Sequence, residues 1–297
     1  MILSTSTNLL CERPDGTMYP LEDTLRVCSK AGFNTFDMSF YEWSYPEMPF
    51  LGDAWRKWIN GIADLKDQLG ISFYQSHAYT YDFLNPRFES ASERAYYENL
   101  VFRSLECCRI LGCKVVVVHP SMDPAVKECS EERWKKNIPY LERYLEYADK
   151  CGMELAVENM YQYSGNTKDL FFADPQEIAA LIDSYGDSRL GVCWDFEHGV
   201  ILKQDQPQAV RILDKRLKAT HVSDTASDEF EPYMHILPFS GMLDWKPIMN
   251  ALTEICYEGA FSFEAHNFAK KLPEELLTTA MKFAWEIGDY LTNTLTK

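Results

Sequence analysis

Basic charge and long apolar runs are both scarce in this sequence. Its 29 Lys and Arg residues stand against 45 Asp and Glu residues, which gives a formal net charge of −16. Because nucleic acids and anionic membrane surfaces attract basic proteins, this balance argues against both as partners. No stretch approaches the roughly 20 apolar residues of a membrane helix, and the N-terminal MILSTSTNLL lacks the basic start of a signal peptide. We therefore expect a cytoplasmic protein that binds neither nucleic acid nor a membrane.

The cysteine spacing of a zinc knuckle or a disulfide framework is also missing. The nine cysteines are odd in number and include no Cys-x-x-Cys pair, which is typical of reduced thiols. No Pro/Gly/Ser-rich linker, low-complexity tract or internal repeat divides the chain. The sequence thus predicts a single domain over residues 1–297.

Short β-rich stretches alternate with longer amphipathic ones. Apolar residues three and four positions apart predict helices over 54–69, 91–111, 131–151 and 245–256. The run KVVVVH is continuously apolar, as in a parallel strand covered on both faces. The eight predicted strands are 2–7, 35–40, 71–76, 114–119, 154–159, 190–195, 219–222 and 261–264. Eight strand–helix units favour a closed (β/α)8 TIM barrel over the alternative, a doubly wound open sheet.

The histidines gather at one end of the predicted strands. None of the six lies in a predicted helix, and active sites of such barrels form where the strands end. This distribution favours a metal or proton-transfer site over scattered core histidines. The long irregular segment 224–244, which carries one of them, is also expected to have a functional role. The six are His77, His119, His198, His221, His235 and His266.

Carboxylates end three of the apolar strands. Glu158, Asp195 and Glu264 follow such runs, and His221 lies in the strand between the last two. A buried carboxylate needs a partner or a metal, and these strand ends supply almost no lysine or arginine for a salt network. Three hard oxygens and one imidazole suit Mn, Mg, Co or Zn.

An ordered set of motifs resembles a known family. VVVVHPS, LAVENM, CWDFEHG, THVSD, HILPFSGMLDW and FSFEAH resemble the sugar isomerase/epimerase family of the xylose isomerase-like TIM barrels, whose superfamily includes endonuclease IV-type enzymes. The resemblance implies one divalent metal per chain, held by Glu158, Asp195, His221 and Glu264. It also implies that Glu158 and Glu264 move the substrate proton. It further implies that His198 contacts a substrate oxygen. His77, His119 and His235 are further candidate substrate contacts. Trp194 is a candidate wall for a sugar face, with packing in the core as the equal alternative.

The expected activity is a metal-dependent isomerase or epimerase that moves a proton next to a carbonyl, through an enediolate, on a keto-sugar or polyol. No phosphate-binding turn is evident in the last two loops, which favours an unphosphorylated substrate. The family often carries an arginine in the stretch that here reads VSDTASDEF, and an acid in the stretch that here reads YQYSGN; neither is present. The substrate contacts therefore depart from the family pattern.

Three alternatives stay open at this stage. One is a metal-dependent dehydratase of a keto-polyol of the inosose type, which would share the proton-abstraction step. Another is a multi-zinc endonuclease IV-like phosphodiesterase, although Tyr233 stands where that group has an acid. The third is a barrel that keeps a metal for stability or binds a sugar without chemistry. The sequence leaves a homo-oligomer open.

Overall fold

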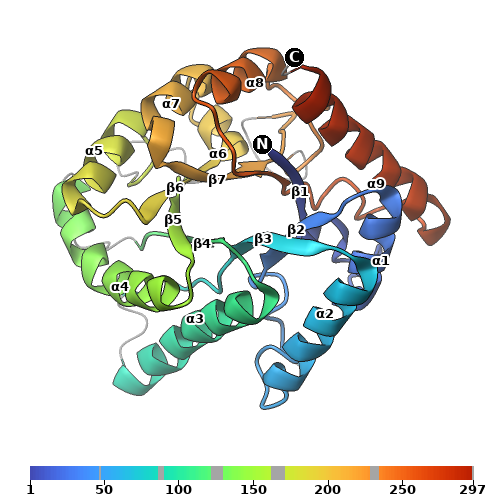
Figure 1. The fold of residues 1–297 in the computed structure, drawn as a ribbon, viewed down its shortest axis with the longest axis horizontal. Helices are drawn as coiled ribbons and strands as arrows, with labels where there is room; N and C mark the ends of the chain where they lie inside the picture. Colours follow the sequence, from blue (N-terminus) through green and yellow to red (C-terminus); the bar gives the residue numbers. More distant parts are fainter. Residues whose placement is uncertain (47, 86–89, 122–129, 162–170, 228–233, 296–297) are drawn as a thin grey trace.

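A computed structural model describes residues 1–46, 48–85, 90–121, 130–161, 171–227 and 234–295. Its parallel strands close into one barrel in the order β1 to β8 (Figure 1), which confirms the predicted TIM barrel. The observed strand ends differ from the predicted ones by at most two residues, and β6 has the predicted bounds. The strands are β1 Ile2–Ser6, β2 Thr35–Ser39, β3 Ser72–His77, β4 Val115–Val118, β5 Glu154–Glu158, β6 Leu190–Asp195, β7 Leu217–Val222 and β8 Ala260–Phe263.

Helices surround the barrel on its outside (Figure 1). Their ends follow local chemistry. The Asp174 carboxylate accepts the Glu177 backbone N–H at the start of α5, and Gly70 ends α2 in the left-handed conformation. The helices are α1 Leu21–Ala31, α2 Trp55–Leu69, α3 Ala91–Leu111, α4 Ser130–Lys150, α5 Pro175–Tyr185, α6 Phe196–Ile201, α7 Gln206–Leu213, α8 Trp245–Glu254 and α9 Glu274–Asp289. Among the described residues, no helix has the length and apolar character needed to cross a bilayer.

The short helix α6 corrects one expectation. The sequence places no histidine in a helix, yet His198 lies within α6. The cause is local, because the Asp195 Oδ1 atom accepts the His198 backbone N–H at 2.8 Å and so caps a helix directly after β6.

The segment after β7 is anchored at both ends. Asp224 forms an antiparallel bridge with Ile236, and its Oδ1 atom accepts the backbone N–H groups of Thr225 and Leu243. Residues 228–233, including Tyr233, lie outside the described residues.

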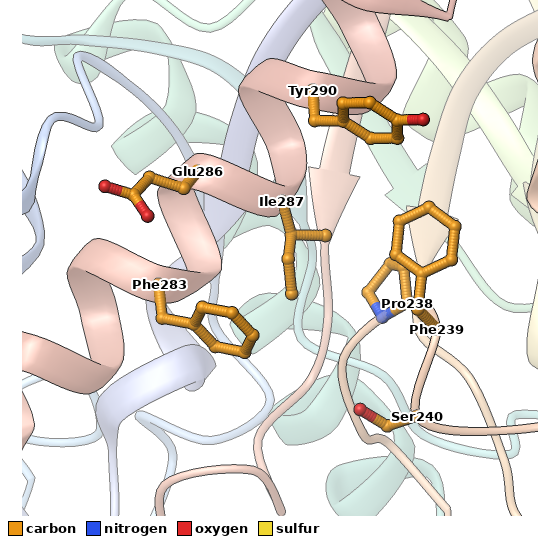
Figure 2. Close-up of a pocket in the computed structure, with 7 residues that line it drawn as sticks. All are labelled: Pro238, Phe239, Ser240, Phe283, Glu286, Ile287 and Tyr290. Carbon is orange, nitrogen blue, oxygen red and sulfur yellow. The ribbon is translucent and has the colours of Figure 1, made fainter.

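Farther along, Pro238 and Phe239 face Ile287 of α9 across a cavity of about 470 Å³ (Figure 2). Its lining is mainly apolar.

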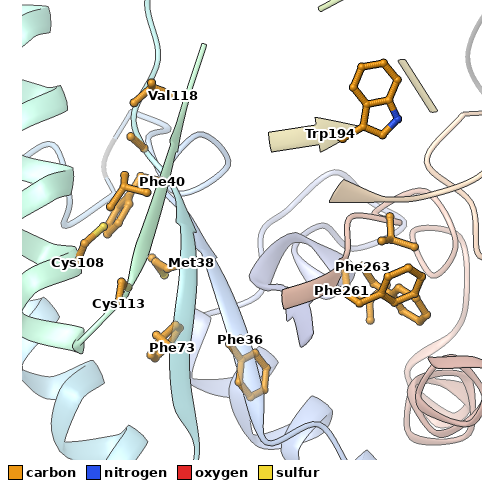
Figure 3. Packing of buried hydrophobic residues seen from close by; sticks show 14 of the residues in the cluster. Phe36, Met38, Phe40, Phe73, Cys108, Cys113, Val118, Trp194, Phe261 and Phe263 are labelled. Atoms are coloured by element: carbon orange, nitrogen blue, oxygen red, sulfur yellow. The ribbon is translucent and has the colours of Figure 1, made fainter. Parts of the chain in front are cut away.

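Side chains alternate across the barrel wall. Val115 and Val117 of β4 pack inside the barrel with small residues, whereas Val116 and Val118 belong to the larger core beneath the helices. Figure 3 shows part of that outer core, including Phe36, Phe73 and Phe261. Because β4 buries apolar residues on both faces, its sequence is the continuous apolar run KVVVVH.

Candidate metal and substrate site

Strand alternation brings four predicted ligands to one place. Ala156, Cys193 and Ala219 face the barrel interior, and Glu158, Asp195 and His221 follow each of them by two residues on the same face. Glu264 comes directly after β8. The ligand atoms of Glu158, Asp195, His221 and Glu264 all lie within 4.8 Å of one another.

Glu158 is the centre of the imidazole contacts. Its Oε1 atom lies 3.0 Å from His221 Nδ1, and its Oε2 atom lies 3.1 Å from His119 Nε2 and 3.3 Å from His77 Nε2. The two Nε2 atoms of His77 and His119 are 3.0 Å apart. Glu158, His77 and His119 therefore form a second group with metal-ligand spacing, and the two groups share Glu158.

The two glutamates have opposite protonation tendencies. Burial opposes the charge of Glu158, but His221 and His119 outweigh it and hold the pKa of this carboxyl well below its usual range. For Glu264, burial and the neighbouring Glu158 charge raise the pKa to about 8. Glu264 nevertheless has partners, because its Oε1 atom accepts from Asn8 Nδ2 at 3.1 Å and its Oε2 atom lies 3.0 Å from His221 Nδ1. The surroundings thus favour the ionised form of Glu158 and the neutral form of Glu264 in the metal-free site.

Asn159 joins the ends of β5 and β6. Its side chain accepts the Asp195 backbone N–H at 2.5 Å and donates to the Asp195 carbonyl at 3.0 Å. Its own carbonyl accepts from His198 Nδ1 at 2.7 Å. This bond places the His198 proton on Nδ1 and leaves Nε2 as the ring's acceptor. One side chain therefore positions a predicted metal ligand and a predicted substrate contact.

Above these ligands lies a cavity of about 460 Å³. Most of the predicted site residues border it, whereas Asp195 and His221 are buried beneath. Trp194 is not among its lining residues: it is fully buried, and its indole N–H donates to Gln206 at 2.9 Å. Since Trp194 and Asp195 are neighbours on a strand, they point to opposite faces, so an aromatic wall from Trp194 was a wrong expectation. The predicted residues at the cavity are His77, His119, Glu158, His198, His235 and Glu264.

Several lining residues follow the first two strands or lie beyond the FSFEAH motif after β8, where the sequence offered no histidine pattern or motif match. Glu42 accepts from Asn8 Nδ2 at 3.4 Å and from the Ser39 hydroxyl, so its carboxylate is fixed at the cavity wall. Lys270 lines the cavity and forms an ion pair with Glu12 at 2.7 Å. The only signal for these residues was their polarity after strands, which is too common to single them out.

Glu197 holds His235 in place. Its Oε2 atom accepts the His235 backbone N–H at 2.6 Å and the Ser223 hydroxyl at 3.1 Å, and its Oε1 atom lies 3.6 Å from His235 Nε2. His235 has a positive φ of 51°, which is unusual for a residue with a side chain. Burial and the neighbouring Asp195 charge raise the pKa of Glu197 to about 9. The His235 ring stacks on His266 with a centroid separation of 4.1 Å.

The donor set fits a divalent metal. Three carboxylates and one imidazole converge, and the buried Asp195 Oδ2 atom has no hydrogen-bond partner among the described residues. A buried carboxylate oxygen without a partner is costly, and a cation bound by the four residues would compensate it. Oxygen-rich sets of this kind suit Mn, Mg, Co or Zn.

Known proteins match almost the whole chain. The family model described as Xylose isomerase-like TIM barrel matches residues 25–284. Uncharacterized protein MJ1188 of Methanocaldococcus jannaschii is 24% identical over 278 residues, which span 91% of this chain and 92% of the relative. The structure of D-psicose 3-epimerase with D-tagatose from Clostridium cellulolyticum H10 has a TM-score of 0.75 at 14% identity and covers 98% of this chain and 99% of its own. The IolI protein with a bound zinc atom has a TM-score of 0.71 at 18% identity, with 98% of both chains covered. At these identities the two solved structures show a shared fold.

Proposed function

The chain belongs to the xylose isomerase-like TIM barrel family, and from that premise we propose that it is a divalent-metal-dependent isomerase or epimerase of a keto-sugar or polyol. The observation that carries the proposal is the group Glu158, Asp195, His221 and Glu264, whose ligand atoms lie within 4.8 Å of one another at the base of a 460 Å³ cavity. The sugar 3-epimerases among its structural neighbours support the same reaction class.

The residues of this chain suit proton transfer at a carbon next to a carbonyl. A bound metal would withdraw charge from the substrate's carbonyl and hydroxyl oxygens and so acidify that carbon. Glu158 removes the proton in the ionised form that its histidine neighbours favour. Glu264 supplies a proton from its own position, so delivery to the same carbon gives an epimer and delivery to the adjacent carbon gives an isomer. His198, whose Nδ1 proton is held by the Asn159 carbonyl, offers Nε2 to a substrate hydroxyl.

The cavity chemistry favours an uncharged polyhydroxy substrate. Lys270 is the one lysine or arginine among the described residues that line the cavity, and Glu12 neutralises it at 2.7 Å. Glu42 provides a fixed carboxylate that accepts hydroxyl protons and repels phosphate. Loss of water from the same substrate type, as in an inosose-type dehydratase, would begin with the same proton removal.

The group of His77, His119 and Glu158 favours a second candidate function. It could hold a second ion, which a multi-zinc phosphodiesterase would need. The net charge of −16 opposes binding of a nucleic acid, so we rank this candidate below the sugar enzyme.

The test is solvent-proton exchange. The metal-reconstituted protein is incubated in heavy water with ketopentoses, ketohexoses and an inosose, and deuterium next to the carbonyl is followed by NMR. We expect exchange with at least one substrate and loss of at least about 100-fold in rate for Glu158→Gln and for Glu264→Gln, the range of general acid–base contributions. Glu154→Gln is the matched control, because Glu154 starts the same strand and pairs with Lys218; it should keep the parent rate.

Other outcomes are informative. An absence of exchange with every ketose and the inosose, at full metal occupancy, contradicts the proposal. Two or three zinc ions per chain together with cleavage of abasic DNA would replace it with the phosphodiesterase. Exchange accompanied by release of water identifies the dehydratase.

A further inference from the structure

A second carboxylate lies inside the barrel, below the candidate metal ligands. Asp37 is the central residue of β2 (TFDMS), and its neighbours Phe36 and Met38 belong to the outer core. It is fully buried. Neither the histidine pattern nor the family motifs include it, and it does not line the cavity.

Donors converge on one oxygen of Asp37. The Oδ2 atom accepts from Gln75 Nε2 at 2.6 Å and from the Ser262 hydroxyl at 3.4 Å, and it lies 3.5 Å from His221 Nε2. His221 is the one basic side chain within 4.0 Å of this carboxylate in the part of the chain that the structure describes. A buried carboxylate in an apolar barrel needs such donors to offset its lost hydration.

The two nitrogens of His221 face different groups. Nδ1 lies 3.0 Å from Glu158 Oε1 and 3.0 Å from Glu264 Oε2, so this nitrogen belongs to the candidate metal group. Nε2 points the other way, to Asp37. A neutral imidazole that gives its Nδ1 lone pair to a metal must carry its proton on Nε2.

We propose that Asp37 is a positioning residue that accepts the Nε2 proton of His221 and thereby presents Nδ1 to the metal. The inference rests on the metal site of the proposed function and adds a residue behind it. Carboxylates that hold a ligating histidine in this way fix its tautomer and ring orientation and raise its basicity. Gln75 supports the arrangement from β3, because its amide also donates to the Thr220 carbonyl at 3.3 Å and so spans the barrel interior.

Cys193 is the competing partner. Its buried thiol forms a hydrogen bond with His221, and burial nevertheless raises the thiol's pKa. A thiol is a weak acceptor compared with a carboxylate, so it should hold the imidazole less firmly. The experiment must therefore separate Asp37 from Cys193.

The test measures metal affinity in chelator-stripped protein by calorimetry, with Mn²⁺ and with Zn²⁺. Asp37→Asn should weaken binding by about 10- to 100-fold, the usual effect of removing such a partner. Ser262→Ala removes another Asp37 contact but leaves the Asp37 carboxylate opposite His221 Nε2, and Cys193→Ala removes the competing partner; both should change affinity by less than about threefold. Thermal unfolding of each variant reports whether a loss reflects the fold instead.

A second readout needs no variant. Nitrogen-15 NMR of the zinc-loaded parent protein should show His221 with Nδ1 bound to zinc and Nε2 protonated. Zinc on Nε2, unchanged affinity in a folded Asp37→Asn variant, or a loss confined to Cys193→Ala would each overturn the inference while leaving the proposed function intact. A parent protein that binds neither metal would overturn the proposed function and this inference together.

Discussion

Replacing Glu158 with glutamine should destabilise the metal-free protein more at pH 6 than at pH 10. Burial lowers the pKa of His77, but its hydrogen bond to Glu158 and the Glu158 charge outweigh that effect and raise the pKa to about 9. A histidine with a raised pKa stabilises the folded state below its unfolded pKa, and this stabilisation disappears as the pH rises through the folded pKa. The relevant window is therefore about pH 6.5 to 9.

The size of the destabilisation at pH 6 follows from the pKa shift of His77. A rise from 6.5 to about 9, at about 1.4 kcal/mol per pH unit, corresponds to about 3 kcal/mol. This agrees with the loss of about 3–5 kcal/mol found when one member of a buried ion pair is removed. Urea unfolding in the presence of chelator, at pH 6 and at pH 10, measures the difference in unfolding free energy between parent and variant.

Glu264→Gln is the matched comparison, because Glu264 belongs to the same candidate metal group. Burial and Glu158 raise the pKa of Glu264, so its ionisation favours the unfolded state as the pH rises. Its removal should therefore raise the stability of the metal-free protein, increasingly toward high pH. Equal losses for Glu158→Gln at both pH values, or a destabilising Glu264→Gln, would refute this account of the site's charges.

Three further predictions concern the metal, the strand ends and the long segment. Addition of Mn²⁺ or Zn²⁺ at 100 times its dissociation constant should stabilise the parent by about 2.7 kcal/mol, and chelator should reverse the shift in melting temperature; an unchanged melting curve contradicts a metal site. Asn159→Ala removes two hydrogen bonds to the Asp195 backbone and should cost about 2 kcal/mol in urea unfolding, with weaker metal binding; unchanged affinity would refute its positioning role. Asp224→Ala removes acceptors for Thr225, Leu243 and the Trp245 indole and should cost about 3 kcal/mol, whereas the helix-cap variant Asp244→Ala should cost about 1 kcal/mol. Similar losses for these two variants would show that the segment is not held by Asp224.

Much of the fold was predictable because its signals are local. Short β-rich runs and helix periodicity act within a few residues, so they placed all eight strands in order. Parallel strands must gather their carboxyl ends at one rim of a barrel. That is why Glu158, Asp195, His221 and Glu264 could be named as a group without coordinates. The single-domain assignment, the cytoplasmic location and the metal itself stay predictions.

The errors concern two residues of one stretch, Trp194 and His198. Trp194 is aromatic and so was a candidate wall for a sugar face, but its place on the strand turns it outward to Gln206. His198 was expected outside any helix, yet the capping bond of Asp195 starts α6 there. Residue type alone does not reveal either partner.

The sequence by itself determined the order of the strands and the ligand types, because each depends on local chemistry along the chain. Only the tertiary structure decided which distant residues complete the site. Asn8 reaches Glu264 across 256 positions because β1 pairs with β8 when the barrel closes. Asp37 meets His221 because β2 and β7 both send side chains into the same narrow interior. Barrel closure brings these side chains within bonding distance, and no local pattern in the chain records it.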